Sequence, residues 1–292
     1  QKLHPTSGVV LGSVAVGANP RQVSITADSS RILVSRFITP PLPGESTAAV
    51  ATDVGGVPRG GEVIVVTSAM AVERTVVLQH SDRTDTSLQG AGVPNYLAAV
   101  AISPDGRSAW VPSKQDNIKR GALRSGLDLD FQNSVRAISS RIDLTTWLED
   151  SAGRVDHDNS GLGSAAAFHA NGAYLFVALQ TSRQVAVIDA VGKRELFRFD
   201  AGRAPDGLAI SADGQRLYVN NFMDRTLGVH DLTRLTNFGE LVVTAVAAPN
   251  SVASERLLAN VLQGKRLFYD ARDTRLARDG YLSCASCHND GG

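Results

Sequence analysis

The stretch GRAPDGLAISADGQRLYVNN, residues 202–221, decides the fold that the sequence predicts. It holds two short runs in which apolar and polar positions alternate, and the polar turn Ala212-Asp213-Gly214 separates them. Alternating runs on either side of an Asp-Gly turn are typical of a β-hairpin. We therefore predict two antiparallel strands in this stretch.

The same pattern occurs three more times, in segments that begin at Gly17, Gly92 and Gly161. Two further strand-like runs follow three of the four hairpins: Val63–Thr67 and Arg74–Leu78, Gln184–Asp189 and Glu195–Phe199, and Thr226–Asp231 and Leu241–Ala247. Four strands per unit and a compact repeat of about 42 residues are typical of β-propeller blades. A sandwich of hairpins is the alternative, but its strands do not recur at a fixed period.

The sequence RLYVNN at Arg216–Asn221, which follows ADGQ, resembles the YVTN-type repeat of a family of bacterial β-propellers. Looser copies are ILVSR, AWVPS and LFVAL, so the resemblance extends from Leu11 to Ala248. It implies a mainly β protein with a propeller domain over residues 1–250. Four readable blades of four antiparallel strands fall short of the seven usual for that family. We therefore expect the chain to be part of a longer, seven-bladed protein.

Long connections between the predicted strands fall on one face of the blades. With strands A to D counted outward, Phe37–Gly61 and Lys114–Val135 connect B to C, and Gln79–Gly92 and Leu148–Gly161 connect D to the next A. In antiparallel four-stranded blades, these two kinds of connection emerge on the same side. Binding residues often lie on such loops, so we expect this face to bind a partner or substrate. Neutral variation of surface loops is the alternative.

The composition argues against some classes of partner. Lysine and arginine together number 29, as do aspartate and glutamate, so the net charge is near zero. A nucleic-acid or anionic-membrane partner would favour a basic excess. No stretch approaches the ~18 uninterrupted apolar residues of a membrane helix. We therefore expect no nucleic acid and no membrane-spanning segment.

Both cysteines of the chain, Cys284 and Cys287, lie in the sequence SCASCH and are followed at once by His288. Cys-x-x-Cys-His is the attachment motif of c-type haem. The two thiols form thioethers with the vinyl groups of one porphyrin, and the imidazole becomes the proximal iron ligand. On a helical turn, positions i, i+3 and i+4 lie on one side. We predict one covalently attached haem c, bound by both cysteines, with His288 as the iron ligand.

Three alternatives to haem remain open. A zinc knuckle needs four ligands, and the sequence offers no second Cys-x-x-Cys pair or downstream His pair. A thioredoxin-like dithiol is expected in a βαβ context, whereas this motif follows an all-β region. A chance occurrence would have to use both cysteines of the chain.

The residues before the motif resemble the entry to the first haem module of bacterial di-haem cytochrome c peroxidases and their MauG-like relatives. The matching positions are Gly264, Leu267, Phe268, Asp270, Arg275, Leu276, Asp279, Gly280 and 283–288. The departures are a longer Asp-to-Arg spacing and Ala277 in place of a serine. The resemblance implies that residues 251–292 are the N-terminal part of an α-helical cytochrome c domain, apparently truncated.

Two details of residues 251–292 yield further predictions. The apolar spacing of Leu257, Leu258, Val261 and Leu262 predicts a helix with Ser254 as its N-cap. Three arginines are natural partners for haem propionates, although they could equally be ordinary surface charges: Arg272, Arg275 and Arg278.

Two functions are compatible with these motifs. The leading hypothesis is an exported haem c oxidoreductase or electron-transfer protein, whose propeller docks a redox partner protein or a small-molecule substrate. The resemblance implies peroxidase-like or MauG-like oxidation as one specialisation. The alternative is a non-catalytic binding protein with an auxiliary haem or none. Because haem c is attached outside the cytoplasm, we predict a periplasmic or cell-surface location in a bacterium.

The sequence selects neither a catalytic residue nor a sixth haem ligand. The candidate ligands are Met70, Met223, His4, His80, His157, His169 and His230, of which the last two lie in strand-like runs and are expected to be packed in the core. The sequence DHDNSG at residues 156–161 matches the start of a calcium-binding loop, but Ala167 stands where the bidentate glutamate should be. We predict a solvated polar turn there.

Overall fold

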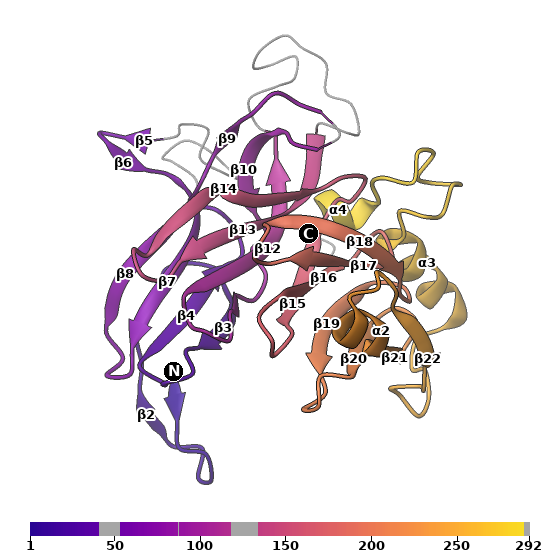
Figure 1. Cartoon of the computed structure of the whole chain (residues 1–292), viewed down its shortest axis with the longest axis horizontal. Helices are drawn as coiled ribbons and strands as arrows, with labels where there is room; N and C mark the ends of the chain where they lie inside the picture. Colours follow the sequence, from indigo (N-terminus) through magenta and orange to yellow (C-terminus); the bar gives the residue numbers. More distant parts are fainter. Residues whose placement is uncertain (41–52, 87, 118–133, 289–292) are drawn as a thin grey trace.

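The computed structural model describes residues 1–40, 53–86, 88–117 and 134–288, and antiparallel β-strands dominate it. Four sheets follow one another along the chain, and each packs against the next (Figure 1). Three of the sheets contain four strands that are hydrogen-bonded in chain order, and the second sheet has six strands, because its inner part is divided and extended. The prediction of four-stranded antiparallel blades is therefore confirmed, and we name the sheets blades I to IV.

Blade I consists of β3 (Pro20–Ile25), β4 (Arg31–Arg36), β7 (Gly60–Thr67) and β8 (Val72–Gln79). Blade II consists of β10 (Ala91–Asn95), β12 (Ser108–Asp116), β13 (Val135–Asp143) and β14 (Leu148–His157). Its first strand is interrupted, because β11 (Ala101–Ile102) pairs with β12 beyond the end of β10. A short strand, β9 (Ser81–Asp82), pairs with the other edge of β10.

Blade III consists of β15 (Gly163–Phe168), β16 (Tyr174–Leu179), β17 (Gln184–Asp189) and β18 (Arg194–Asp200). Blade IV consists of β19 (Pro205–Ile210), β20 (Arg216–Asn221), β21 (Thr226–Asp231) and β22 (Thr244–Ala247). An unpredicted helix, α2 (Thr233–Phe238), lies between the last two strands. Two small hairpins complete the β-structure: β1 (Lys2–Leu3) with β2 (Val10–Gly12), and β5 (Asp53–Val54) with β6 (Val57–Pro58).

A recurring carboxylate fixes the turn between the first two strands of a blade. In blade IV, Asp213 accepts hydrogen bonds from the Ser211 hydroxyl at 2.5 Å and from the backbone N–H of Gln215 at 2.9 Å. Asp28 and Asp105 make the equivalent bonds in blades I and II. The next residue has a positive φ, which glycine adopts most easily: Ser29, Gly106 and Gly214. The Asp-Gly signal in the sequence thus marks the turns of blades II and IV correctly.

The apolar core lies between neighbouring blades. Three clusters of buried side chains each combine residues of two adjacent sheets; representative members are Leu33 and Val111, Trp110 and Leu175, and Phe176 and Leu217. Burying one such side chain contributes about 1.5–3 kcal/mol. The blades are therefore stabilised by their contacts with one another, as the alternating pattern of their strands predicts.

The prediction of a long D-to-A loop over Leu148–Gly161 is wrong, because most of that range is strand β14. In the structure, Arg154 and Glu149 are both almost fully buried and lie 2.6 Å apart as an ion pair. The pair lets a polar sequence occupy the outer strand of a blade, because each charge is compensated by the other.

The prediction of a solvated turn at residues 156–161 is confirmed only for Asp158 and Asn159, which form a turn in which Asn159 is exposed. Asp156 and His157 belong to β14, and His157 and Ser160 are fully buried. Two predicted long loops, Phe37–Gly61 and Lys114–Val135, lie partly outside the described residues.

The C-terminal segment, residues 251–288, contains two helices, α3 (Ala259–Tyr269) and α4 (Cys284–Cys287). Helix α3 begins later than predicted, and Ser254 is not its cap. The carboxylate of Glu255 instead accepts hydrogen bonds from the backbone N–H groups of Arg256 and Leu257, which holds these residues in a turn. A complete α-helical cytochrome domain remains a prediction.

Candidate functional site

The Cys-x-x-Cys-His motif forms a single helical turn with its chemistry directed outward. Helix α4 runs from Cys284 to Cys287, and the backbone N–H of His288 donates to the carbonyl of Cys284 at 2.8 Å. Both thiols are free, and all three residues are exposed, whereas Ala285 and Ser286 between them are fully buried. The arrangement fits a porphyrin, because two sulfurs and an imidazole on the exposed surface of one turn are the groups that c-type haem requires.

Blade II binds the carbonyl end of this turn. The Tyr96 hydroxyl donates to the carbonyl of Cys287 at 3.1 Å, and Lys114 Nζ donates to the carbonyl of Ser286 at 3.3 Å. Lys114 is 4% exposed; its ammonium lies 3.1 Å from Asp116 and 3.7 Å from the centre of the Tyr96 ring. A positive charge at a helix C-terminus stabilises the last carbonyls of the helix. Lys114 and Tyr96 therefore position the Cys-x-x-Cys-His motif.

The buried side of the turn packs against Gly161, which precedes blade III. A Cβ atom built on this glycine would lie 2.4 Å from Ser286 Oγ and 3.2 Å from Leu282 Cδ2. Only a residue without a side chain lets the turn approach so closely. Tyr281, just before the motif, is 1% exposed, and burial raises the pKa of its hydroxyl to about 12.

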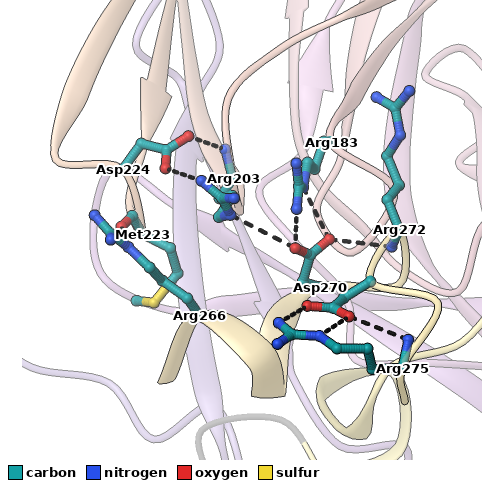
Figure 2. Close-up of polar contacts among 9 residues, drawn as sticks. Arg183, Arg203, Met223, Asp224, Arg266, Asp270, Arg272 and Arg275 are labelled. Atoms are coloured by element: carbon teal, nitrogen blue, oxygen red, sulfur yellow. Dashed lines mark hydrogen bonds and ion pairs between the residues drawn. The ribbon is translucent and has the colours of Figure 1, made fainter. Parts of the chain in front are cut away.

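A second anchor fastens the C-terminal segment to blades III and IV (Figure 2). Asp270 is 4% exposed and forms a two-point ion pair with Arg183, whose Nε lies 2.8 Å from Oδ1. Arg203 lies 3.5 Å from the same carboxylate and also pairs with Asp224 at 2.9 Å. The backbone N–H of Ala271 donates to the carbonyl of Thr181 at 2.9 Å. Arg183 lies in a B-to-C connection, and Arg203 lies in a D-to-A connection. The face of the blades that we predicted to bind a partner or substrate therefore binds this segment of the same chain.

The three arginines proposed as partners for haem propionates each contact an aspartate in the structure. Arg272 lies 2.9 Å from Asp200, Arg275 pairs with Asp273 at 2.5 Å, and Arg278 lies 3.0 Å from Asp279: these are exposed or partly exposed ion pairs. These contacts are the ones expected of ordinary surface charges.

The electrostatics of the motif differ from those of a reactive dithiol. Packing around Cys287 raises the pKa of its thiol, and the nearby ammonium of Lys114 only partly offsets that rise. Reactive cysteines of thiol oxidoreductases have lowered pKa values. Among the described residues, no group of three or more histidine, cysteine or acidic side chains is placed to bind a metal ion.

Most of the upstream candidate ligands have structural roles. His169 is buried, and its Nε2 donates to the carbonyl of Gly214 at 3.1 Å. His230 is buried beside Phe199, and burial lowers the pKa of its imidazole. Both predicted core histidines are therefore confirmed. Met223 is fully buried, and the exposed His4 accepts a backbone hydrogen bond within its own turn.

His157 links blade II to blade III. Its Nε2 lies 2.9 Å from the Ser139 hydroxyl, and its Nδ1 lies 2.5 Å from Glu195 Oε2. Burial raises the pKa of Glu195, but the hydrogen bonds and charges of His157 and Arg198 outweigh it and hold that pKa below its usual value. Serine, histidine and glutamate in this order resemble a hydrolytic triad. Because Ser139 and His157 are both fully buried, the group is a structural link between blades.

Sequence reasoning missed a cavity of about 220 Å³ at the centre of the four blades, which we name the central cavity. A β-bulge at the start of β3, β15 and β19 leaves one residue of each strand outside the regular pairing. Bulges redirect side chains in this way. The three bulged residues, Arg21, Ser164 and Asp206, all line the cavity, as does Ala98, which lies between β10 and β11 of blade II. The repeated position after Pro20, Gly163 and Pro205 is the signal that could have revealed them.

The central cavity adjoins the C-terminal segment. Tyr96, which binds the carbonyl of Cys287, lines the cavity, as does Tyr269 at the end of α3. In the described part of the chain, no helix is both long and apolar enough to cross a membrane.

No known protein family matches the chain, and no curated protein matches it. Solved structures do. The periplasmic gluconolactonase of Pseudomonas aeruginosa superposes with a TM-score of 0.54 at 19% identity, over 87% of this chain and 64% of that one. A functionally unknown protein from Desulfotomaculum acetoxidans gives 0.47 at 14%, over 79% and 56%. The β-propeller domain of Cps50 (Swd1) from Myceliophteria thermophila gives 0.40 at 13%, over 80% and 72%.

The chain spans less than two thirds of the length of the first two of these structures. At such identities the likeness concerns the fold alone. The four packed, four-stranded sheets form a β-propeller scaffold.

Proposed function

We propose that Cys284 and Cys287 attach one haem c covalently and that His288 is its proximal iron ligand. The observation that carries this proposal is the exposure of these three residues on one helical turn, while the two residues between the cysteines are buried. The spacing of the motif supports it independently. When bound, the haem supplies one-electron transfer, or peroxide chemistry if an axial position stays open.

The residues of the chain would hold the attachment turn rigidly on the propeller. Lys114 and Tyr96 bind the last two carbonyls of the turn, and Gly161 leaves space for Ser286. Asp270 anchors the preceding segment through Arg183 and Arg203. A rigid support keeps a redox group at a constant distance and orientation from its partner.

The function that this site supports best is a haem c-dependent oxidoreductase or electron-transfer protein, exported to the periplasm or cell surface. Its propeller would present the haem and dock a redox partner protein or a small substrate. Peroxidase-like or MauG-like oxidation is the specialisation suggested by the motif. Export follows from the chemistry, because thioether attachment of haem takes place outside the cytoplasm. Residues 251–292 would then be the start of a cytochrome c domain.

The proposal is tested by expressing the protein with a periplasmic haem-maturation system. We expect a Soret band that stays with the polypeptide in acid acetone and a mass increase of one haem. Replacing both cysteines by serine should abolish covalent attachment, whereas Ser254→Ala, an exposed change elsewhere in the C-terminal segment, should leave it intact. Protein that stays colourless, or haem that acid acetone extracts, would refute the proposal.

If haem is retained, His288→Ala separates ligation from attachment. The haem should stay covalently bound, and its absorption spectrum should change because the proximal nitrogen is lost. A peroxide-driven oxidation assay then distinguishes an enzyme from an electron carrier. A haem protein that transfers no electrons to any donor or acceptor would instead be a binding protein with an auxiliary haem.

A further inference from the structure

Asp206 is a half-buried carboxylate that lines the central cavity and has no cation beside it. The bulge at the start of β19 takes this residue out of the regular strand pairing. Burial raises its pKa, and the groups that lower that pKa are the Asn220 amide and the backbone N–H of Asp206 itself. No arginine or lysine of the described residues acts on it. Charges held away from water are normally paired, so this carboxylate lacks a positive partner.

The chain supplies such a partner to a comparable carboxylate but not to this one. The buried Asp270 pairs with Arg183. Arg21 lines the central cavity, as Asp206 does, but its guanidinium lies against the Phe37 ring, 4.4 Å from the ring centre. Arg21 is also absent from the groups that shift the pKa of Asp206. The missing positive charge is therefore one that a bound ligand can supply.

One oxygen of Asp206 is accessible to a ligand. Oδ1 accepts a hydrogen bond from the Asn220 amide at 2.7 Å. Oδ2 has no partner among the described residues, and it is not one of their buried unpaired atoms, so it retains accessible surface. The Oγ of Ser164, on the equivalent bulge of blade III, donates to the carbonyl of Pro205 at 2.7 Å, and its lone pairs remain to accept. Because Pro205 directly precedes Asp206, the hydroxyl and the carboxylate are neighbours in the cavity lining.

A carboxylate beside a hydroxyl oxygen favours a protonated amine. An ammonium group carries a positive charge and three hydrogens to donate, so it can bond both acceptors at once. A calcium or magnesium ion takes about six or more oxygen ligands. Within the described ranges, Asp206 belongs to no group of three or more histidine, cysteine or acidic side chains. The lining therefore suits an organic cation better than a metal ion.

The size of the cavity sets the size of the ligand. A cavity of about 150 Å³ accommodates benzene, and the central cavity measures about 220 Å³, so in proportion it holds roughly nine non-hydrogen atoms. We propose that the central cavity binds a small primary amine, whose ammonium group donates to Asp206 and Ser164. Its hydrocarbon part would lie beside the half-buried Phe222 and Tyr269, which also line the cavity. This site is separate from the haem proposal, and binding there does not require haem.

Binding can be measured by calorimetry and by NMR titration with three probes that share one ring. At neutral pH, cyclohexylamine is a cation, cyclohexanol is neutral and cyclohexanecarboxylate is an anion. We expect cyclohexylammonium to bind saturably at millimolar or lower concentration and at least about tenfold more tightly than cyclohexanol, because hydrogen bonds between charged groups are the stronger ones. Equal binding of cyclohexanol would refute the role of the negative charge. Tighter binding of the carboxylate would refute the sign of that charge.

Two variants locate the amine. Asp206→Asn removes the negative charge at similar volume and should weaken binding of cyclohexylammonium about tenfold or more, whereas binding of cyclohexanol should change less than about twofold. The matched control Asp279→Asn, at an exposed position of the C-terminal segment, should bind the amine as the unaltered chain does. If Asp206→Asn folds poorly, Ser164→Ala decides, and it should weaken the amine about 3- to 10-fold.

An NMR signal beside the site gives a further check. The amine should shift the side-chain amide signals of Asn220, because this amide bonds the carboxylate that the amine contacts. The proposal fails if cyclohexylammonium does not bind, or if Asp206→Asn and Ser164→Ala both bind it as the unaltered chain does. Measurement with and without attached haem keeps this outcome distinct from failure of the haem proposal.

Discussion

Gly161→Ala should detach helix α4 and its Cys-x-x-Cys-His motif from the propeller while leaving the blades folded. The new methyl group would lie 2.4 Å from Ser286 Oγ and 2.9 Å from Ser286 Cβ, and the third nearest atom belongs to Leu282. All three atoms are part of the C-terminal segment. Relieving the overlap requires the turn to move by about 1 Å, and overpacking of this kind costs roughly 1–3 kcal/mol. A loss of ~2 kcal/mol raises the equilibrium constant for undocking about 30-fold.

Hydrogen exchange measures this effect directly. Amides of the peptide that covers residues 281–288 should exchange about 30-fold faster in the variant, whereas those of β16 and β17 should keep their protection. The control is Gly264→Ala in α3, where an added Cβ has no atom within 4 Å. The double variant Gly161→Ala with Ser286→Gly removes both clashing atoms of Ser286 and should restore most of the protection. Unchanged exchange in the single variant, or no recovery in the double variant, would contradict the described docking.

Three further predictions concern the anchors and the link between blades. Asp270→Ala removes the carboxylate that Arg183 and Arg203 share, and it should destabilise the C-terminal segment by about 1–3 kcal/mol, because both arginines are partly exposed. Urea unfolding would show no shift in midpoint if this anchor is unimportant, and Asp279→Ala at an exposed site is the control. Tyr281 has a pKa of about 12 in the folded protein and 10.0 in the unfolded chain. Its contribution to the free energy of unfolding is therefore complete below pH 10 and decreases as the pH rises toward 12, by roughly 3 kcal/mol in total. Tyr281→Phe should lack this alkaline loss of stability, and an identical pH profile for the two proteins would refute the assignment. His157→Ala leaves Ser139 and Glu195 without their shared partner and should lower the free energy of unfolding, measured with urea, by ~3 kcal/mol. A decrease no larger than that caused by His4→Ala, at an exposed position, would show that the link is dispensable.

Local patterns predicted the blades well because their causes are local. The strand Gln184–Asp189 was predicted with the observed bounds, since alternating side chains and a nearby turn define it within a few residues. The turn at Asp213 and Gly214 follows from one carboxylate and one positive φ. Patterns failed where a distant partner decides the structure. Strand β14 was predicted to be a loop because the sequence does not reveal that Arg154, buried beside Glu149, also donates hydrogen bonds to the Gln115 side chain and to the carbonyl of Gln79.

The candidate site likewise has one part that the sequence predicts and another that it does not. The motif at Cys284, Cys287 and His288 is recognised from its residue types and spacing alone, and the haem that it predicts stays a prediction. Its supports are not readable, since Lys114 and Gly161 carry no local signal and meet the motif only in the folded chain. The central cavity depends on bulges at the start of three inner strands. Each bulge shifts the pairing register by one residue, but the alternation of apolar and polar residues along the rest of the strand does not reveal it.

The contacts that hold helix α4 also determine when during folding this helix can be bound by the blades. Tyr96 and Lys114 are 191 and 172 residues away in sequence from the carbonyls they bind. Joining such distant segments carries a large entropic cost of loop closure, so these bonds form after the early blades have assembled. The two cysteines consequently lie on a segment that stays unattached to the blades until these contacts form. An enzyme that modifies them has its easiest access in that interval.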